Sequence, residues 1–541
     1  MSIQIKNFSF IYKIVDGKLP KKELRSDIKL SDETYFYQAV IKPDEELKNV
    51  KINIVSELKE YVKIYRVKNV FANKELGWLA DDYVIKSKNS EYPELLLPAE
   101  EISVRKGEVA TFLICIYGKQ NAGVYDIVAE FFSSKRMLGK TTLTLKILSE
   151  SLPDTDFFVT HWLYPDCIAE LHGVKPFDDE FYAILKNYLR EYVFMGNDTL
   201  LLPLLTPALD TEVGKERMTT QLVKIAVNDG QYSFDFSEAD KYISVALAAG
   251  IKKFELSHLF TQWGAEFCPK IVATENGEEK KIFGWNDKSN GDKYTNFLRA
   301  FLPAVAKFFR DKGLEKNVFV HLSDEPNEKH IDLYSEHYAL VKILMPEFVT
   351  LDAMSSYDFY EKKVVDLPVV SISHARPFIR NGVKHAIYYC NCECQNYETN
   401  RFLAMSALRC RVLGFVAYYC GAAGFLHWGF NFYHTGYSKK IIDPFKDNSA
   451  GGYFPSGDSF LVYPDIKGGG CFKTLRLCYL LSAMQDRRVC ILAERLYGKS
   501  FVKKLLAKYG FCGYNVYPHS EEFFEKLRKD IYKFVERKIK K

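Results

Sequence analysis

Long apolar runs and targeting segments are missing from this chain of 541 residues. No stretch reaches the roughly 18 consecutive apolar residues that a membrane-spanning helix requires. The first residues, Met1 to Lys6, lack the basic start, apolar centre and small-residue cleavage site of a signal peptide. Internal repeats and low-complexity segments are absent as well. We therefore expect a cytoplasmic protein that has no membrane partner.

An excess of one charge sign is lacking too. Lys and Arg number 74 against 69 Asp and Glu, a net charge of +5. No basic face, RNA-binding motif or zinc-finger spacing accompanies this small excess, so we expect no nucleic-acid partner. Hydrophobic residues make up 47% of the chain, enough to fill the cores of two or three domains, which excludes a disordered protein.

The 12 cysteines do not form a disulfide or zinc pattern. Without a secretory signal, reduced thiols are expected. Cys390, Cys392 and Cys394 are closely spaced, but structural zinc sites favour two to four intervening residues and a second ligand pair, and neither occurs. On a strand, this spacing places all three on one face as small apolar side chains. We predict structural cysteines and no metal or other cofactor.

The first 150 residues have the pattern of a β-sandwich domain. Short, partly alternating apolar runs are separated by turn residues such as Lys106-Gly107 and Asn121-Ala122-Gly123. The polar, turn-rich segment after Leu148 is typical of a linker. The runs are Thr34 to Ile41, Lys51 to Val55, Tyr61 to Val67, Thr111 to Tyr117 and Val124 to Phe132.

Residues 155–490 alternate apolar strand-like runs with helix-like segments, which predicts a (β/α)8 barrel of the TIM type. Residues 491–541 are expected to form a helical extension, in which the amphipathic run from Glu521 presents solvated lysines. A membrane-surface role for this run is the less favoured alternative. The eight expected strands are Phe157 to His161, Thr199 to Leu205, Lys253 to Ser257, Val318 to Ser323, Phe348 to Asp352, Val369 to Ser373, Ala386 to Cys390 and Gly424 to Trp428.

Histidines, tryptophans and acids gather where these strands are expected to end, although the chain has only 11 His and 5 Trp. One such histidine is more often a structural hydrogen-bonding group, but several at one rim indicate a binding site. Aromatic rings beside acids are typical of sugar sites, because a ring packs on apolar C–H faces while acids bind hydroxyls. The candidates are His161, Trp162, His258, Trp263, Asp324, Glu325, Asp352, His374, Tyr389, Asn391, Trp428 and Tyr463.

The strongest candidates are Asp324 and Glu325, which end the apolar run that begins at Val318. Asp and Glu are poor strand formers, so the run predicts a buried strand that delivers two acids into a loop. Parallel barrels carry their chemistry at such ends. The alternative is that Asp324 caps a helix within residues 327–344.

Several segments resemble glycoside hydrolase family 123. They are Tyr92 to Pro98, Asn121 to Tyr125, Ser323 to Pro326, Leu426 to Asn431, Gly457 to Pro464 and Leu475 to Leu477. Cys478 stands where members of the family are expected to carry an acid, and residues 479–488 match the family's helix only in part. The resemblance implies a β-N-acetylgalactosaminidase that acts by a substrate-assisted retaining mechanism. Trp428 and Tyr463 are the pocket residues that it supports best.

Two adjacent carboxylates suit that mechanism. Consecutive strand residues point to opposite faces, so Asp324 and Glu325 cannot flank one bond as an acid and a protein nucleophile do. We therefore expect the 2-acetamido oxygen of the sugar to attack, with Glu325 as general acid and then base. Asp324 then stabilises the oxazolinium, and its charge and an apolar surround raise the pKa of Glu325. Tyr389 is a candidate donor to the acetamido carbonyl.

Other functions remain open at this point. The chain is also compatible with a hydrolase for β-N-acetylglucosamine or for a sugar without an acetamido group. A non-catalytic carbohydrate-binding protein has the same fold requirements. In each case the expected partner is an oligosaccharide or glycoconjugate.

Overall fold

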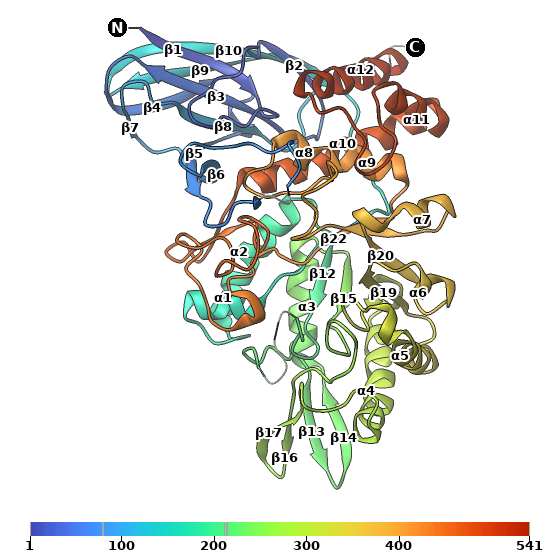
Figure 1. The fold of residues 1–541 in the computed structure, drawn as a ribbon. Coiled ribbons are helices and arrows are strands. Elements are labelled where there is room, and N and C mark those ends of the chain that lie inside the picture. Colours follow the sequence, from blue (N-terminus) through green and yellow to red (C-terminus); the bar gives the residue numbers. More distant parts are fainter. Residues whose placement is uncertain (1, 78–79, 210, 212–214, 540–541) are drawn as a thin grey trace. The chain divides into compact units, whose positions relative to one another are not determined.

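The computed structural model describes residues 2–77, 80–209, 211 and 215–539. The chain forms two compact units (Figure 1). Unit 1 combines Met1–Asp156 with Cys394–Cys420 and Phe472–Lys541, and unit 2 combines Phe157–Glu393 with Gly421–Cys471. The three consecutive domains expected from the sequence stay a prediction about how the chain is divided.

Unit 1 contains two five-stranded sheets in the N-terminal region. The first has the order β1-β3-β8-β5-β6, with β1 Ile3–Ser9, β3 Tyr35–Pro43, β8 Ala110–Ile116, β5 Val62–Phe71 and β6 Glu91–Pro98. The second has the order β2-β10-β9-β4-β7, with β2 Ser26–Leu30, β10 Arg136–Leu148, β9 Gly123–Ser133, β4 Leu47–Val55 and β7 Ile102–Val104. Pairing is antiparallel except between β2 and β10.

A shared core joins these sheets into a sandwich. Every second residue of β3, from Tyr35 to Ile41, is buried in the same apolar cluster as Ile127, Ala129 and Phe131 of β9. Because side chains alternate across a strand, one apolar residue in two suffices to cover the inner face. The predicted all-β sandwich is thus confirmed.

Helices complete unit 1: α8 Ala407–Arg411, α9 Leu413–Cys420, α10 Leu475–Tyr497, α11 Lys499–Lys508 and α12 Glu521–Ile539. Gly414 allows α9 to approach α10 closely, since a Cβ there would lie 1.9 Å from the Ala483 carbonyl oxygen. In α12 the apolar face that includes Leu527 and Ile531 is buried, as the amphipathic pattern predicts. The C-terminal helices are therefore confirmed.

Unit 2 is built on a closed barrel of eight strands, all parallel. Each of the eight predicted runs supplies one barrel strand, so the TIM-type barrel is confirmed. The strands, in barrel order, are β11 Phe158–His161, β12 Thr199–Leu202, β15 Lys253–Leu256, β18 Val318–Val320, β19 Val349–Met354, β20 Leu367–Ser371, β21 Ala386–Tyr388 and β22 Gly424–His427.

Helices lie between successive barrel strands (Figure 1). They are α1 Pro165–His172, α2 Asp179–Phe194, α3 Ser237–Ala249, α4 Asp292–Asp311, α5 Ile331–Leu344, α6 Asp358–Glu361 and α7 Arg376–Arg380. Helix α4 buries one apolar face, which includes Phe297, Phe301 and Val305, and leaves charged residues on the other.

Two smaller sheets were not predicted. One has the order β14-β13-β16-β17, formed by β14 Gln231–Asp235, β13 Lys224–Asn228, β16 Ile271–Glu275 and β17 Glu278–Phe283. Its strands leave the barrel after β12 and β15, and two of them, β14 and β17, are largely polar and exposed and so lack an apolar run. The other pairs β23 Tyr463–Asp465 with β24 Gly470–Phe472.

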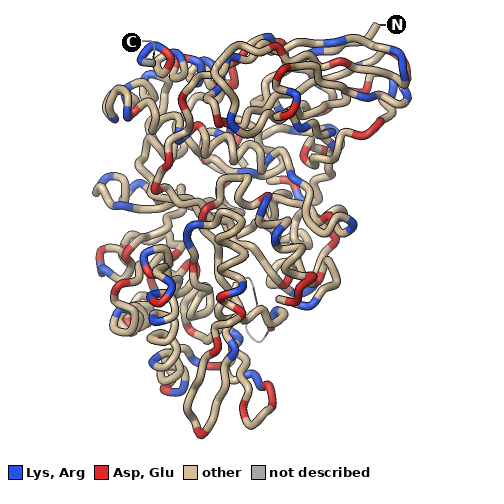
Figure 2. Tube along the Cα trace, turned by 180° about the vertical axis from the view of Figure 1, so that it is seen from behind, with Lys and Arg blue, Asp and Glu red and all other residues tan. Residues whose placement is uncertain are grey.

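Acidic and basic residues are interspersed over both units, as the near balance of 74 and 69 charges predicts (Figure 2). None of the helices that the structure describes combines the length and apolar character needed to cross a bilayer.

Candidate active site

A solvent-open cavity of about 110 Å³ lies where the barrel strands of unit 2 end at their carboxyl termini. Aromatic side chains dominate the wall, and Asp324 and Glu325 are the carboxylates among the lining residues. The full lining is Trp162, Tyr164, Leu209, Gln262, Trp263, Asp324, Glu325, Ala353, Tyr388, Cys390, Asn391, Leu426, Trp428 and Phe454.

Asp324 and Glu325 stand in a bend beyond the fourth barrel strand, not on the strand itself. The predicted strand to Ser323 ends at Val320, so the expectation that strand alternation separates the two acids is wrong. Glu325 has a left-handed backbone with φ 46°. Its N–H donates to the Ala353 carbonyl at 3.1 Å, and the Asp324 carbonyl accepts from Trp263 N–H at 2.8 Å. Both acids thereby face one cavity.

A different residue caps the helical segment that follows. The side chain of Asn327 accepts a hydrogen bond from the N–H of Lys329 at 3.1 Å and begins the short 3-10 turn before α5. The alternative that Asp324 caps this helix is therefore wrong, so capping does not explain why Asp324 lies at the cavity.

Asp352, at the inner side of the bend, fixes the segment that leads to the two acids. Its carboxylate accepts hydrogen bonds from the N–H groups of Leu322 at 3.1 Å and Ser323 at 3.2 Å, and from the hydroxyl of Tyr334. Asp352 is fully buried in β19. A carboxylate with this many donors replaces the backbone pairing that the chain gives up when β18 ends.

His321 lies between two buried carboxylates. Its Nδ1 is 3.0 Å from Asp352 and its Nε2 is 2.6 Å from Glu255. Burial alone would lower the pKa of His321, but the hydrogen bonds to Asp352 and Glu255 raise it to about 9. The imidazolium is therefore the form present at neutral pH, and it connects β18 to β15 and β19 beneath the cavity.

The charged His321 and its partner Glu255 also support the cavity wall. The indole N–H of Trp162 donates to Glu255 at 3.3 Å, and His258 stacks on His321 with ring centres 4.4 Å apart. Burial, with the charge of His321 added, holds the pKa of His258 well below its usual value. Trp162 is thus positioned by a buried network in which His258 is neutral.

Opposing effects act on the carboxyl group of Glu325. Burial raises its pKa, a hydrogen bond from the Tyr388 hydroxyl at 2.8 Å lowers it, the charge of Glu393 raises it and a hydrogen bond from Trp263 lowers it. The net pKa is raised above the usual value. The sequence led us to expect a raised pKa for Glu325, with the charge of Asp324 as one cause. The pKa is raised, but the neighbouring charge that contributes is that of Glu393.

Glu393 itself is buried and held by donors. It accepts hydrogen bonds from the hydroxyl of Ser371, from the hydroxyl of Ser373 at 3.3 Å and from the N–H of Cys390 at 2.8 Å. These donors stabilise a carboxylate close to Glu325 that does not itself line the cavity.

Trp428 forms part of the wall and is fixed from behind. Its indole N–H donates to Asp458 at 3.2 Å, and Asp458 also lies 3.3 Å from Nε2 of His427. Because Nδ1 of His427 accepts from the N–H of Gly429 at 3.0 Å, its Nε2 carries the proton. Asp458 therefore orients two consecutive side chains.

Half of the residues predicted for the site line the cavity, and half do not. The lining residues are Trp162, Trp263, Asp324, Glu325, Asn391 and Trp428. Of the others, Nδ1 of His161 lies 2.8 Å from Oδ1 of Asn197. Tyr463, which belongs to β23, packs against Phe460, and His374 is an exposed residue that follows β20. His258 and Asp352 are buried below the cavity, and Tyr389 packs against Phe425 and His427. The sugar contacts predicted for these six find no support in the structure.

Tyr388 is the residue that the sequence interpretation missed most narrowly. It lines the cavity where Tyr389 was expected: Tyr388 is the last residue of β21, whereas Tyr389, just beyond the strand, packs against Phe425 and His427. Glu255 did leave a trace in the sequence: it is a charged residue inside the apolar run of β15.

The three cysteines at residues 390–394 lie in a turn, because β21 ends at Tyr388. The prediction that they share one face of a strand is therefore wrong. Cys394 is buried, Cys392 is exposed and Cys390 lines the cavity. All 12 cysteines are free thiols, as expected.

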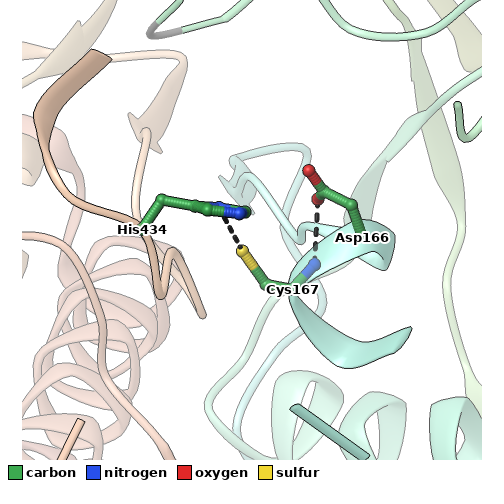
Figure 3. Close-up of side chains that lie close together, drawn as sticks. All are labelled: Asp166, Cys167 and His434. Atoms are coloured by element: carbon green, nitrogen blue, oxygen red, sulfur yellow. Dashed lines mark hydrogen bonds between the residues drawn. The ribbon is translucent and has the colours of Figure 1, made fainter. Parts of the chain in front are cut away.

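One buried cluster in unit 2 has the composition of a metal site. Potential ligand atoms of Asp166, Cys167 and His434 lie within 4.8 Å of one another (Figure 3). However, Arg217 makes two hydrogen bonds to Asp166, at 2.7 and 2.8 Å, and burial raises the pKa of the Cys167 thiol. A guanidinium already neutralises the carboxylate, so these residues do not fit a cation.

Arg217 instead secures the cavity wall. Its guanidinium stacks 4.6 Å from the ring centre of Tyr164 and donates to the Leu209 carbonyl at 3.2 Å, and both of these residues line the cavity. Through Arg217, Asp166 at the start of α1 thereby holds the described part of the loop after β12 against the cavity wall.

Comparisons with known proteins agree with this architecture. The family model described as "Glycoside hydrolase 123, catalytic domain" matches residues 162–492. The fold is similar to that of a family 123 glycoside hydrolase from Clostridium perfringens, analysed for glycolipid glycan hydrolysis, with a TM-score of 0.74, 17% identity, and coverage of 100% of this chain and 98% of that chain. At this identity the likeness shows the fold alone.

Two further solved structures are more distant. A family 39 glycoside hydrolase from Bacteroides cellulosilyticus WH2 has a TM-score of 0.34 at 10% identity and covers 85% of this chain and 81% of its own. A family 5 xyloglucanase from Bacteroides ovatus has a TM-score of 0.30 at 10% identity, with coverage of 86% and 98%. No curated protein matches the chain.

Proposed function

The chain belongs to glycoside hydrolase family 123 and so is a glycosidase, and from this premise we propose that it removes terminal β-linked N-acetylgalactosamine from glycans by a substrate-assisted retaining mechanism. The observation that carries the proposal is the pair Asp324 and Glu325, which enter one aromatic-lined cavity from one bend. The Clostridium perfringens relative, studied for glycolipid glycan hydrolysis, supports a glycan substrate.

Glu325 acts first as general acid. Its raised pKa favours the protonated carboxyl, and this proton passes to the glycosidic oxygen as the C1–O bond breaks and the leaving group departs as an alcohol. The acetamido carbonyl oxygen bonds to C1 and forms an oxazolinium. In the second step Glu325, now a carboxylate, accepts a proton from the water that attacks C1 and reopens the ring. Two inversions at C1 give retention.

Asp324 holds the acetamido group. Its carboxylate accepts the acetamido N–H, which orients the carbonyl oxygen toward C1 and stabilises the positive charge that develops on the ring. Trp428 offers an aromatic face for the apolar side of the sugar, and Trp162 forms part of the wall.

A protein nucleophile finds less support. In a two-carboxylate retaining enzyme, the acid and the nucleophile approach the sugar from opposite sides, about 5–5.5 Å apart. Among the described residues that line the cavity, Asp324 and Glu325 are the only acids, and they are adjacent in the chain. In the proposed mechanism the nucleophile therefore comes from the substrate.

Two substrates that differ only in the acetamido group test this mechanism. An aryl N-acetyl-β-galactosaminide should be hydrolysed far faster than the matching aryl β-galactoside, because the acetamido group reacts as well as binds. A thiazoline mimic of the cyclised intermediate should bind more tightly than the substrate. The matching N-acetyl-β-glucosaminide gives the preference at C4.

Equal turnover of the two galactosides, together with a covalently trapped carboxylate, would replace this mechanism with the two-carboxylate one. A folded protein that hydrolyses none of the aryl glycosides would contradict the proposed substrate class.

A further inference from the structure

The cavity wall beside Glu325 continues into a row of solvent-facing aromatic rings. Trp263 lines the cavity and is 42% exposed, whereas Trp162 is only 2% exposed. The Trp263 ring meets Tyr437 at 5.9 Å, and Tyr437 meets Tyr453, itself 45% exposed, at 5.6 Å. We call Trp263, Tyr437 and Tyr453 the aromatic ledge.

The rings of the ledge are held in place. The Lys439 ammonium lies 5.3 Å from the ring centre of Tyr437 and 5.8 Å from that of Tyr453, and it donates to the Tyr453 hydroxyl at 3.4 Å. Tyr453 also packs on the backbone of Gly436, where an added Cβ would meet its ring at 2.3 Å. Exposed rings fixed in this way lose little freedom when a ligand binds.

The backbone at the ledge is also unusual. Trp263 has φ 63°, Tyr437 has φ 59° and Ser438 has φ 50°, all left-handed conformations that non-glycine residues avoid. Such conformations cluster at ligand-binding sites, where surrounding structure enforces them. Here they point aromatic side chains outward instead of allowing them to fold into the core.

The position of Glu325 indicates what the ledge meets. A general acid gives its proton to the oxygen that bridges the cleaved sugar and the leaving group, so the leaving group begins beside Glu325. Trp263 donates a hydrogen bond to that carboxyl and forms the inner end of the ledge. The ledge therefore begins beside the carboxyl group that faces the leaving group.

We propose that the aromatic ledge binds the sugar residue on the leaving-group side of the scissile bond, so that an oligosaccharide is cleaved more efficiently than a simple glycoside. The proposal rests on the function proposed above, because it takes Glu325 as the acid. The apolar C–H face of the second sugar packs on Trp263 and Tyr437, and Tyr453 extends the surface to the next unit.

Kinetics with two substrates test the proposal. N-Acetyl-β-galactosaminyl fluoride has a single atom as its leaving group and does not reach the ledge, whereas a disaccharide that adds one β-linked hexose does. Tyr437→Ala and Tyr453→Ala should each lower the ratio of kcat/KM for the disaccharide to that for the fluoride by about 10-fold, equal to roughly 1.4 kcal/mol. Tyr232→Ala, in β14 of the separate four-stranded sheet, is the matched control and should leave the ratio unchanged.

Binding separates failure of this proposal from failure of the proposed function. The Glu325→Gln protein, titrated calorimetrically, should bind the disaccharide more tightly than N-acetylgalactosamine, and Tyr437→Ala in that background should remove the difference. If wild-type protein hydrolyses both substrates but neither tyrosine variant changes the ratio or the binding difference, the ledge is not a sugar site. If neither substrate is hydrolysed, the proposed function fails. The binding difference still decides whether the ledge binds a sugar.

Discussion

The hydroxyl group of Tyr388 donates a 2.8 Å hydrogen bond to Oε1 of Glu325. It joins the ends of the fourth and seventh barrel strands across the cavity. The bond favours the charged carboxylate, while burial and the charge of Glu393 favour the protonated form. The balance among these effects sets the pH range in which Glu325 keeps a proton, and each contribution has its own test.

Removing either cavity acid should abolish most of the activity. Glu325→Gln and Asp324→Asn should each lower kcat by roughly 10²- to 10⁴-fold, the usual cost of losing one acid–base group. Circular dichroism should show an intact fold. Glu328→Gln, an exposed acid three residues further along the chain, is the control and should retain full activity. A folded Glu325→Gln protein with normal turnover would remove Glu325 from the mechanism.

Tyr388→Phe should move the pH profile upward. The lost hydrogen bond stabilised the Glu325 carboxylate, so its removal raises the pKa of Glu325 further. As a general acid, Glu325 acts below its pKa, so the alkaline limb of kcat/KM should shift to higher pH. An unchanged or downward-shifted limb would mean that another group controls it.

Glu393→Gln should move the same limb in the opposite direction. The charge of Glu393 raises the pKa of Glu325, so a neutral amide in its place lowers that pKa and the alkaline limb shifts to lower pH. Glu361→Gln, an exposed acid in α6, serves as the control. Shifts of the same sign in the Tyr388 and Glu393 variants would contradict the opposing effects of these two residues on Glu325.

His321 should contribute stability that depends on pH. Its pKa of about 9 in the folded protein lies above the ordinary 6.5, so the contribution is complete below pH 6.5 and is lost as pH rises through about 9. The shift corresponds to about 3 kcal/mol. The difference in thermal midpoint between wild-type protein and His321→Gln should therefore shrink between pH 6.5 and pH 9.5. A difference that grows over this interval would mean that His321 is neutral in the fold.

The sequence alone determined the barrel and the location of its reactive end. Strands of a parallel barrel are buried on both sides, so each appears as a short continuous apolar run, and all eight runs were visible. Because such strands carry function at their carboxyl ends, the pattern also indicated Asp324, Glu325, Trp162 and Trp428, all of which line the cavity.

Only the tertiary structure decided how the chain turns after each strand and which neighbouring side chain faces the cavity. The bend at Asp324 depends on Asp352, 28 positions away in the chain, which accepts the N–H groups that β18 leaves unpaired. The choice of Tyr388 over Tyr389, and the effect of Glu393 on Glu325, likewise follow from contacts between different barrel strands. Periodicity along one strand distinguishes two faces, but only packing against the rest of the barrel determines which of them is inside.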